Sequence, residues 1–136
     1  MTVNLGPRTL TLPHTDLHDL AFGWCSITAL GDFNPDTGGQ LVLWNLRLVV
    51  RFPPGATVFI PSALVKHSNC PIAEDEVRYS ITQWGAADIF RWVENGFKNN
   101  CDINREASEE EKIQRKENQR TRWKDGLKMY PKFPPS

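Results

Sequence analysis

The sequence predicts a mainly β domain, on three observations. Short stretches rich in β-branched and aromatic residues recur through the first 84 residues, and turns rich in Gly and Pro separate them. The strand–helix–strand alternation of parallel-sheet folds is missing. The chain has 136 residues, of which 40% are hydrophobic, which is enough for one core. These features are typical of a sandwich, a barrel or a jelly roll.

The expected strands follow one another along the first part of the chain. Residues 9–12 alternate between polar and apolar and stop at Pro13, so we expect the first strand there. The Asn- and Gly-rich segment 34–39 and the Pro-Pro-Gly run 53–55 supply turn chemistry. The remaining strands are expected at residues 22–33, 41–44, 46–52, 56–61 and 77–84.

A short helix is expected after the last strand. Asp88 is of a residue type that caps helices, and the pattern continues to Phe97. Phe90, Val93 and Phe97 recur at helical spacing, so we expect this helix to bury them on one face.

Residues 102–125 predict a second, highly charged helix. Ser108 and Glu111 have the spacing of a capping box. Apolar residues are few, so we expect the helix to be weakly docked or extended. The chain is therefore divided into a β domain at 1–100 and a charged helical tail at 101–136, which is basic from residue 112.

The zero net charge of the chain conceals two segments of opposite sign. Residues 1–111 carry 8 basic and 14 acidic side chains, and residues 112–136 carry 8 basic and 2 acidic ones. A basic segment of this kind either binds a polyanion or forms an ordinary solvated helix face, and charge alone leaves both interpretations open.

Composition also excludes several classes of protein. No apolar run approaches the roughly 18 residues of a membrane span, and we expect neither a leader nor a membrane partner. The three cysteines are scattered without CxxC spacing, which argues against a disulfide scaffold and suits a reducing, intracellular compartment. The oligomeric state is left open.

Three histidines are the only ones in the chain, and two of them suggest a metal site. His14-Thr15-Asp16 is an HxD pattern beside the first expected strand, where residues i and i+2 share a face. His67 follows a later strand and could approach from a facing one. Two histidines and one carboxylate are the ligand set of non-haem Fe(II) oxygenases, although an HxD pattern alone is weak.

Arg78 and Ser80 strengthen this interpretation. They lie two residues apart in an expected strand, so they share one face. An arginine facing into a β-fold is costly unless it meets an anion, and its fork suits a carboxylate. No strand-matched acidic partner is evident. The pattern predicts iron at one end of a dicarboxylic acid and a guanidinium at the other.

Other residues near these motifs receive more ordinary roles. His18 lies four residues after His14, but the proline before His14 disfavours a helix, so we expect His18 on a loop at the pocket rim. Trp24 and Cys25 either line the pocket or belong to the core, and Trp84 is expected in the core.

The pattern HxD…H…RxS in a β-rich chain resembles the signature of Fe(II)/2-oxoglutarate-dependent dioxygenases. The stretch GWCSITALGDFNPDTGGQLVLWNLRLVVRFPPGATVFIPSALVKHSN looks like fungal dioxygenases of the ten-eleven translocation/base-J-binding (TET/JBP) group, which are often encoded near mobile elements. The stretch RYSITQWGAADIFRWVENGF does so too. The resemblance covers about residues 10–98 and implies a double-stranded β-helix, the jelly roll of this superfamily.

The resemblance also implies roles for the candidate residues. His14, Asp16 and His67 become the catalytic iron ligands, and Arg78 with Ser80 becomes the anchor for 2-oxoglutarate, with O₂ as the oxidant. The implied reaction oxidises 5-methylcytosine in DNA to 5-hydroxymethylcytosine, on a base flipped out of the duplex. A nuclear location follows from that substrate.

Several alternatives stay open at this point. The same chemistry could act on a protein or a small molecule, or the chain could be an inactive, cupin-like binding module. Members of the group carry a longer region before the first ligand than the thirteen residues here, so the chain could be a minimal active form, a partner-dependent form or a degenerate remnant with compromised activity. DNA is the expected partner, with residues 112–136 as one means of contact.

Overall fold

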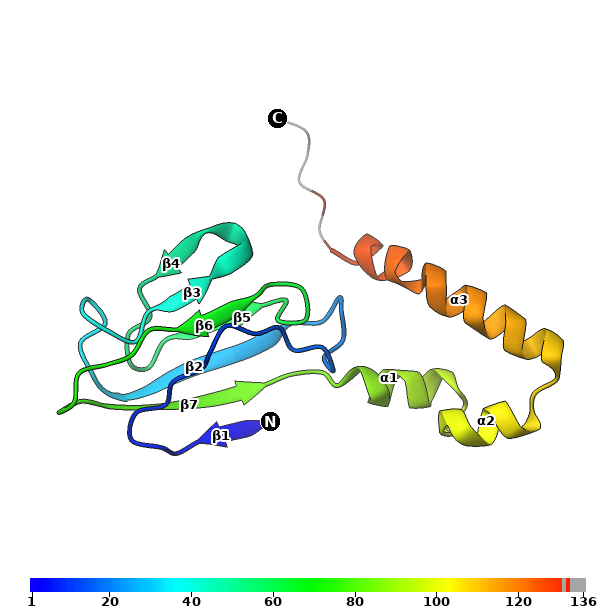
Figure 1. Cartoon of the computed structure of the whole chain (residues 1–136), viewed down its shortest axis with the longest axis horizontal. Coiled ribbons are helices and arrows are strands. Elements are labelled where there is room, and N and C mark those ends of the chain that lie inside the picture. The colour runs from blue at the N-terminus through cyan, green and yellow to red at the C-terminus, as the bar shows by residue number, and fades with distance from the viewer. Residues whose placement is uncertain (131, 133–136) are drawn as a thin grey trace.

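The strands form two antiparallel sheets in a computed structural model that describes residues 1–130 and 132 (Figure 1). The four-stranded sheet runs in the order β1 (Thr2–Asn4), β7 (Val77–Gln83), β2 (Cys25–Asp32) and β5 (Thr57–Ile60). The three-stranded sheet runs in the order β4 (Leu48–Val50), β3 (Leu41–Leu43) and β6 (His67–Asn69), with a 3-10 turn, η1, at Trp44–Leu46.

The mainly β class is confirmed, and every strand expected from residue 22 onward is present in shortened form. Over the part of the chain that the structure describes, the two sheets do not close into a barrel. The jelly roll as such therefore stays a prediction.

The hydrophobic core draws on both sheets. Strand β2 alternates, so that Cys25, Ile27 and Ala29 are buried on one face. The other buried members of the cluster are Phe33, Leu41, Leu43, Phe52 and Ile60. Removing their apolar surface from water stabilises the pair of sheets by about 25 cal/mol for each Å² buried.

The prediction of a strand at residues 9–12 is wrong. The segment 7–14, which we call the strap, instead crosses from one sheet to the other. It forms a parallel bridge to Arg78 of β7 near its start and an antiparallel bridge to His67 of β6 at its end. Asn69 of β6 holds the middle, because its Oδ1 accepts from the Thr11 amide at 2.8 Å. The backbone of the strap is thus hydrogen-bonded to strands of two different sheets, so the strap is not a strand of either sheet.

Helix α1 (Ala87–Glu94) differs in detail from the expected helix. Asp88 is not the N-cap: it lies in the first turn and pairs with Arg91 at 3.1 Å. The first amide of the helix, that of Ala87, donates to the His18 carbonyl at 3.0 Å, and no side chain caps the helix. The helix ends before Phe97, whose φ is 64°.

The expected burial of the apolar face of α1 is also wrong. Phe90, Val93 and Phe97 are all exposed. The polar side of α1 faces α3 (Glu109–Lys128), where Glu94 forms an ion pair with Arg122. The polar side of α1 thus lies toward α3, while its apolar face is exposed.

The single helix expected at 102–125 is two helices, α2 (Asn100–Glu106) and α3. The break falls at Ala107, and Ser108 then begins α3 through the predicted capping box with Glu111, which is confirmed. Whether the chain divides at residue 100 stays a prediction. No helix in the described ranges is both long and apolar enough to cross a membrane.

The end of α3 returns to the β domain (Figure 1). Gly126 is the only buried residue of α3, and a Cβ there would lie 2.4 Å from the Phe22 ring. The Tyr130 hydroxyl donates to the Ala21 carbonyl at 3.2 Å, and the Tyr130 ring meets Trp24 edge-on. The helices therefore form an appendage that is docked at its end and otherwise exposed, as the scarcity of apolar residues led us to expect.

Candidate metal centre

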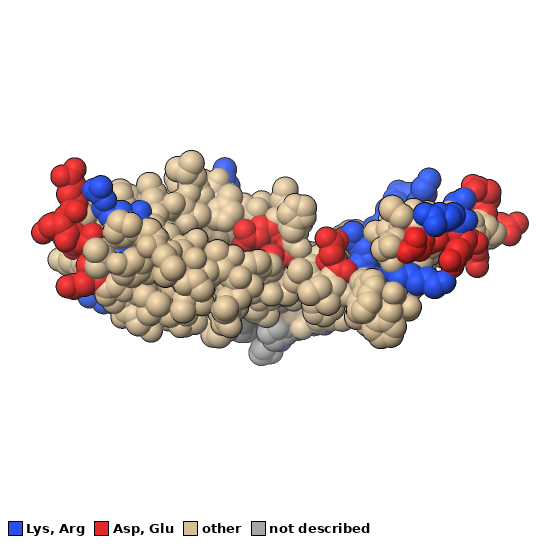
Figure 2. Space-filling view, turned by 90° about the horizontal axis from the view of Figure 1, so that it is seen from below, with Lys and Arg blue, Asp and Glu red and all other residues tan. Residues whose placement is uncertain are grey.

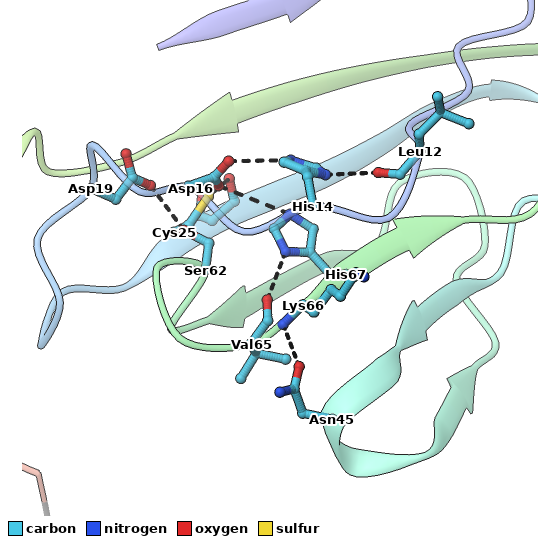
Figure 3. A network of polar contacts seen from close by, with 11 residues as sticks. Leu12, His14, Asp16, Asp19, Cys25, Asn45, Ser62, Val65, Lys66 and His67 are labelled. Carbon is cyan, nitrogen blue, oxygen red and sulfur yellow. Dashed lines mark hydrogen bonds and ion pairs between the residues drawn. The ribbon is translucent and has the colours of Figure 1, made fainter.

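The three predicted metal ligands lie together (Figure 3). The Asp16 carboxylate is 3.2 Å from His14 Nε2 and 3.9 Å from His67 Nε2. The imidazole centroids are 4.4 Å apart. The strap brings His14 to His67 through paired backbone hydrogen bonds, and the Asp16 amide donates to the Ser62 carbonyl at 3.0 Å. These contacts place one carboxylate between two imidazoles.

Backbone carbonyls fix both imidazoles. His14 Nδ1 lies 2.9 Å from the Leu12 carbonyl, and His67 Nδ1 lies 2.9 Å from the Val65 carbonyl (Figure 3). Because a carbonyl only accepts, each Nδ1 is the donor, and each ring directs its Nε2 atom toward Asp16. Two imidazole nitrogens and a carboxylate oxygen that converge in this way could hold a metal ion between them. Two imidazole nitrogens and a carboxylate fit Fe(II), and backbone hydrogen bonds to Nδ1 are typical of metal-binding histidines.

A second group beside this one, Asp16, Asp19 and Cys25, is a weaker metal site. Burial raises the pKa of the Cys25 thiol to about 11, so the sulfur is protonated at neutral pH and is a poor ligand. Burial also raises the pKa of Asp19. The hydrogen bond that the Asp19 carboxylate accepts from Ser62 Oγ at 2.8 Å lowers this pKa, but by less than burial raises it. Of the two roles left open for Cys25, the structure assigns it to the core.

The burial of Cys25 gives a direct prediction. In the folded protein at pH 8, iodoacetamide should modify exposed Cys101 at least about tenfold faster than Cys25, because Cys25 is both buried and protonated. Peptide mass spectrometry of a labelling time course measures the two rates. Unfolding in denaturant should make them similar, and equal rates in the native protein would contradict the assignment of Cys25 to the core.

Arg78 supplies the second element of the site. Its side chain is 2% exposed and lines the same cavity of about 550 Å³ as the three metal-ligand candidates. Nη1 donates to the Thr9 carbonyl at 3.2 Å, whereas Nε has no hydrogen-bond partner among the described residues. Burial lowers the pKa of Arg78 from its ordinary value, but a guanidinium stays charged in proteins. A buried cation with an unpaired donor calls for an anion in the cavity.

Ser80 lies beside Arg78, and further residues complete the cavity wall. Ser80 is buried, lines the cavity and accepts a hydrogen bond from Asn4 of β1 at 2.9 Å. His18 also lines the cavity, as expected. Trp84 was expected in the core, which is wrong: it is 36% exposed and lines the cavity. Its register could have revealed this, since it continues the alternation that begins at Arg78.

No protein-family model matches the sequence, and no curated protein matches it. Among solved structures, the chain is similar to NgTET1 in complex with 5mC DNA, with a TM-score of 0.51 and 24% sequence identity. The likeness covers 56% of this chain and 27% of that one, so the chain spans only about a quarter of that protein. At this identity the likeness is one of fold.

Proposed function

We propose that the chain is an Fe(II)/2-oxoglutarate-dependent dioxygenase of the TET/JBP kind, built on a jelly roll, that oxidises 5-methylcytosine in DNA to 5-hydroxymethylcytosine. One observation carries the proposal: a single cavity contains both the His14–Asp16–His67 group and the buried, partly unpaired Arg78. The similarity in fold to NgTET1, a protein seen in complex with 5mC DNA, also supports the proposal.

One set of residues would bind the metal, and another would bind the co-substrate. His14, Asp16 and His67 would hold Fe(II), which with 2-oxoglutarate and O₂ supplies the oxidation of a C–H bond. The Leu12 and Val65 carbonyls keep both Nε2 atoms available to the metal. Three protein ligands leave further coordination positions open for the co-substrate and the oxidant.

The other end of the co-substrate would be held by Arg78 and Ser80. The guanidinium fork would pair with the distal carboxylate of 2-oxoglutarate, and the Ser80 hydroxyl would add a hydrogen bond. Trp84 lines the same cavity and presents an indole surface. Such a surface suits the stacking of a planar base that has been flipped out of the duplex.

Turnover on methylated DNA tests the proposal. Purified protein with Fe(II), 2-oxoglutarate and a methylated duplex should give succinate and 5-hydroxymethylcytosine by mass spectrometry, and the unmethylated duplex should give no oxidised base. Succinate without base oxidation would point to a protein or small-molecule substrate. Absence of iron-dependent 2-oxoglutarate binding would overturn the oxygenase and leave a cupin-like binding module.

DNA contact would involve the basic segment 112–136, which includes α3 from Lys112 to Lys128. Basic residues recur at every fourth position of the helix and form what we call the basic ridge: Lys112, Lys116, Arg120, Lys124 and Lys128. At 1.5 Å per residue the ridge is about 24 Å long. Figure 2 shows Lys and Arg side chains over the helical part of the molecule, interspersed with Asp and Glu side chains. Three ridge residues have only local, exposed acidic partners, and such pairs compete weakly with phosphate.

Neutralising the ridge should weaken DNA binding. In the triple variant Lys116→Gln, Arg120→Gln, Lys124→Gln, we expect the slope of log affinity against log salt to fall by up to about 3, or roughly 0.9 for each lost phosphate contact. Fluorescence anisotropy of a labelled duplex at several salt concentrations measures this slope.

A matched triple variant controls for net charge. Arg47→Gln, Arg51→Gln and Lys98→Gln remove the same charge from exposed positions outside α3. Their slope should stay close to that of the wild type. An unchanged slope in the ridge variant, or equal losses in both triples, would make α3 an ordinary solvated helix.

A further inference from the structure

Strand β1 brings an unassigned amide to the co-substrate end of the cavity. Strand β1 lies beside β7 (Figure 1). Asn4 is directly opposite Ser80 in their ladder, so both side chains share the face that carries Arg78. Asn4 Nδ2 is 2.9 Å from Ser80 Oγ, and all three residues line the cavity. Strand β1 is thus part of the site, although it contributes none of the residues expected from the sequence motifs.

The direction of this hydrogen bond determines what Ser80 can offer. An amide NH₂ group only donates, so Ser80 Oγ is the acceptor and its own proton is free to point elsewhere. Ser80 is 5% exposed, and in the described structure its hydroxyl donates to no side chain or carbonyl. Two residues away, the buried Arg78 side chain lines the same cavity. A carboxylate has two oxygens, one for the Ser80 hydroxyl and one for the Arg78 guanidinium.

We propose that Asn4 is a positioning residue that fixes the Ser80 hydroxyl as a donor, so that Ser80 and Arg78 together bind the distal carboxylate of the co-substrate. This inference rests on the proposed function, since it takes 2-oxoglutarate to be the anion. Because Asn4 donates to Ser80 Oγ, the Ser80 proton is directed away from Asn4 and suits an acceptor at this end of the cavity.

Calorimetric titration of Mn(II)-loaded protein with 2-oxoglutarate tests the role of Asn4. We expect Asn4→Ala to weaken binding about threefold, because the Ser80 hydroxyl loses its fixed direction. Asn4→Asp should weaken it about tenfold or more, because a carboxylate accepts the Ser80 proton and removes that donor. Affinity for 2-oxobutyrate, which lacks the distal carboxylate, should change in neither variant.

Two further variants separate positioning from support of the fold. Val3→Ala alters the same strand on the opposite face, where Val3 pairs with Ile81, and should leave both affinities unchanged. In a Ser80→Ala background, Asn4→Ala should add no further loss, since Asn4 acts through the hydroxyl.

The outcomes are distinguishable. If Asn4→Ala has no effect on 2-oxoglutarate, or weakens 2-oxobutyrate equally, the role of Asn4 is wrong while the proposed function stands. An additive loss in the Ser80→Ala background would likewise overturn it. If the wild-type protein binds no 2-oxoglutarate, the proposed function fails, and the role of Asn4 fails with it.

Discussion

His67→Ala is expected to lower the affinity of the protein for a divalent metal by at least about a hundredfold. Mutating a residue that only hydrogen-bonds to a metal ligand already costs up to about a hundredfold in metal affinity, and losing the ligand itself should cost at least as much. His67 is buried in β6, and the Val65 carbonyl orients its ring. Its loss leaves one imidazole and one carboxylate, and two ligands hold Fe(II) poorly. Titration with Mn(II), followed by calorimetry or by the electron paramagnetic resonance signal of free Mn(II), measures the change.

His18 offers a matched control for this variant. It lines the same cavity but does not belong to the group of converging ligands. His18→Ala removes the same functional group and should keep wild-type metal affinity. Metal affinity that survives in His67→Ala, or an equal loss in His18→Ala, would contradict the assignment of the three ligands.

Arg78→Lys is expected to weaken the binding of 2-oxoglutarate about tenfold or more while metal affinity is retained. The ammonium keeps the charge but replaces a two-pronged fork by a point charge, and one charge-assisted hydrogen bond is worth about 1.5–3 kcal/mol. Calorimetric titrations of the same variant with 2-oxoglutarate and with Mn(II) separate the two effects. Equal loss of both ligands would indicate a disturbed fold.

The burial of Arg78 allows a second variant, in which ligand binding is lost but the stability of the ligand-free protein is not. A buried guanidinium without an anion costs stability, so Arg78→Met should abolish 2-oxoglutarate binding without lowering the unfolding temperature of the ligand-free protein. A large drop in unfolding temperature would mean that Arg78 serves the core through its contact with the Thr9 carbonyl.

The placement of the candidate site was predictable because its residues obey local rules. Arg78 and Ser80 share a face because a strand alternates, and that strand is present as β7. The position of His14 has a different cause from the one that alternation predicts. The segment before it is not a strand of one sheet, because the strap is hydrogen-bonded to strands of both sheets. Only the tertiary fold determines such a crossing, so alternation could not reveal it.

Two other features lay beyond local patterns. Strand β1 is three residues long, too short for alternation to be visible, so the contact of Asn4 with Ser80 follows only from the register with β7. Helix α1 has a clear apolar face, but Glu94 and Arg122 turn its polar side toward α3. Amphipathicity therefore predicts that a helix forms, but it does not predict which face of the helix packs against the rest of the protein.

The central claim is that one cavity holds a metal ion and a dicarboxylate together. Anomalous diffraction from crystals soaked with Mn(II) and 2-oxoglutarate tests it most directly. We predict one manganese peak bounded by Nε2 of His14, Nε2 of His67 and the Asp16 carboxylate, with the distal carboxylate of 2-oxoglutarate on Arg78. A cavity without manganese at saturating concentration, or a dicarboxylate bound away from Arg78, would contradict the claim.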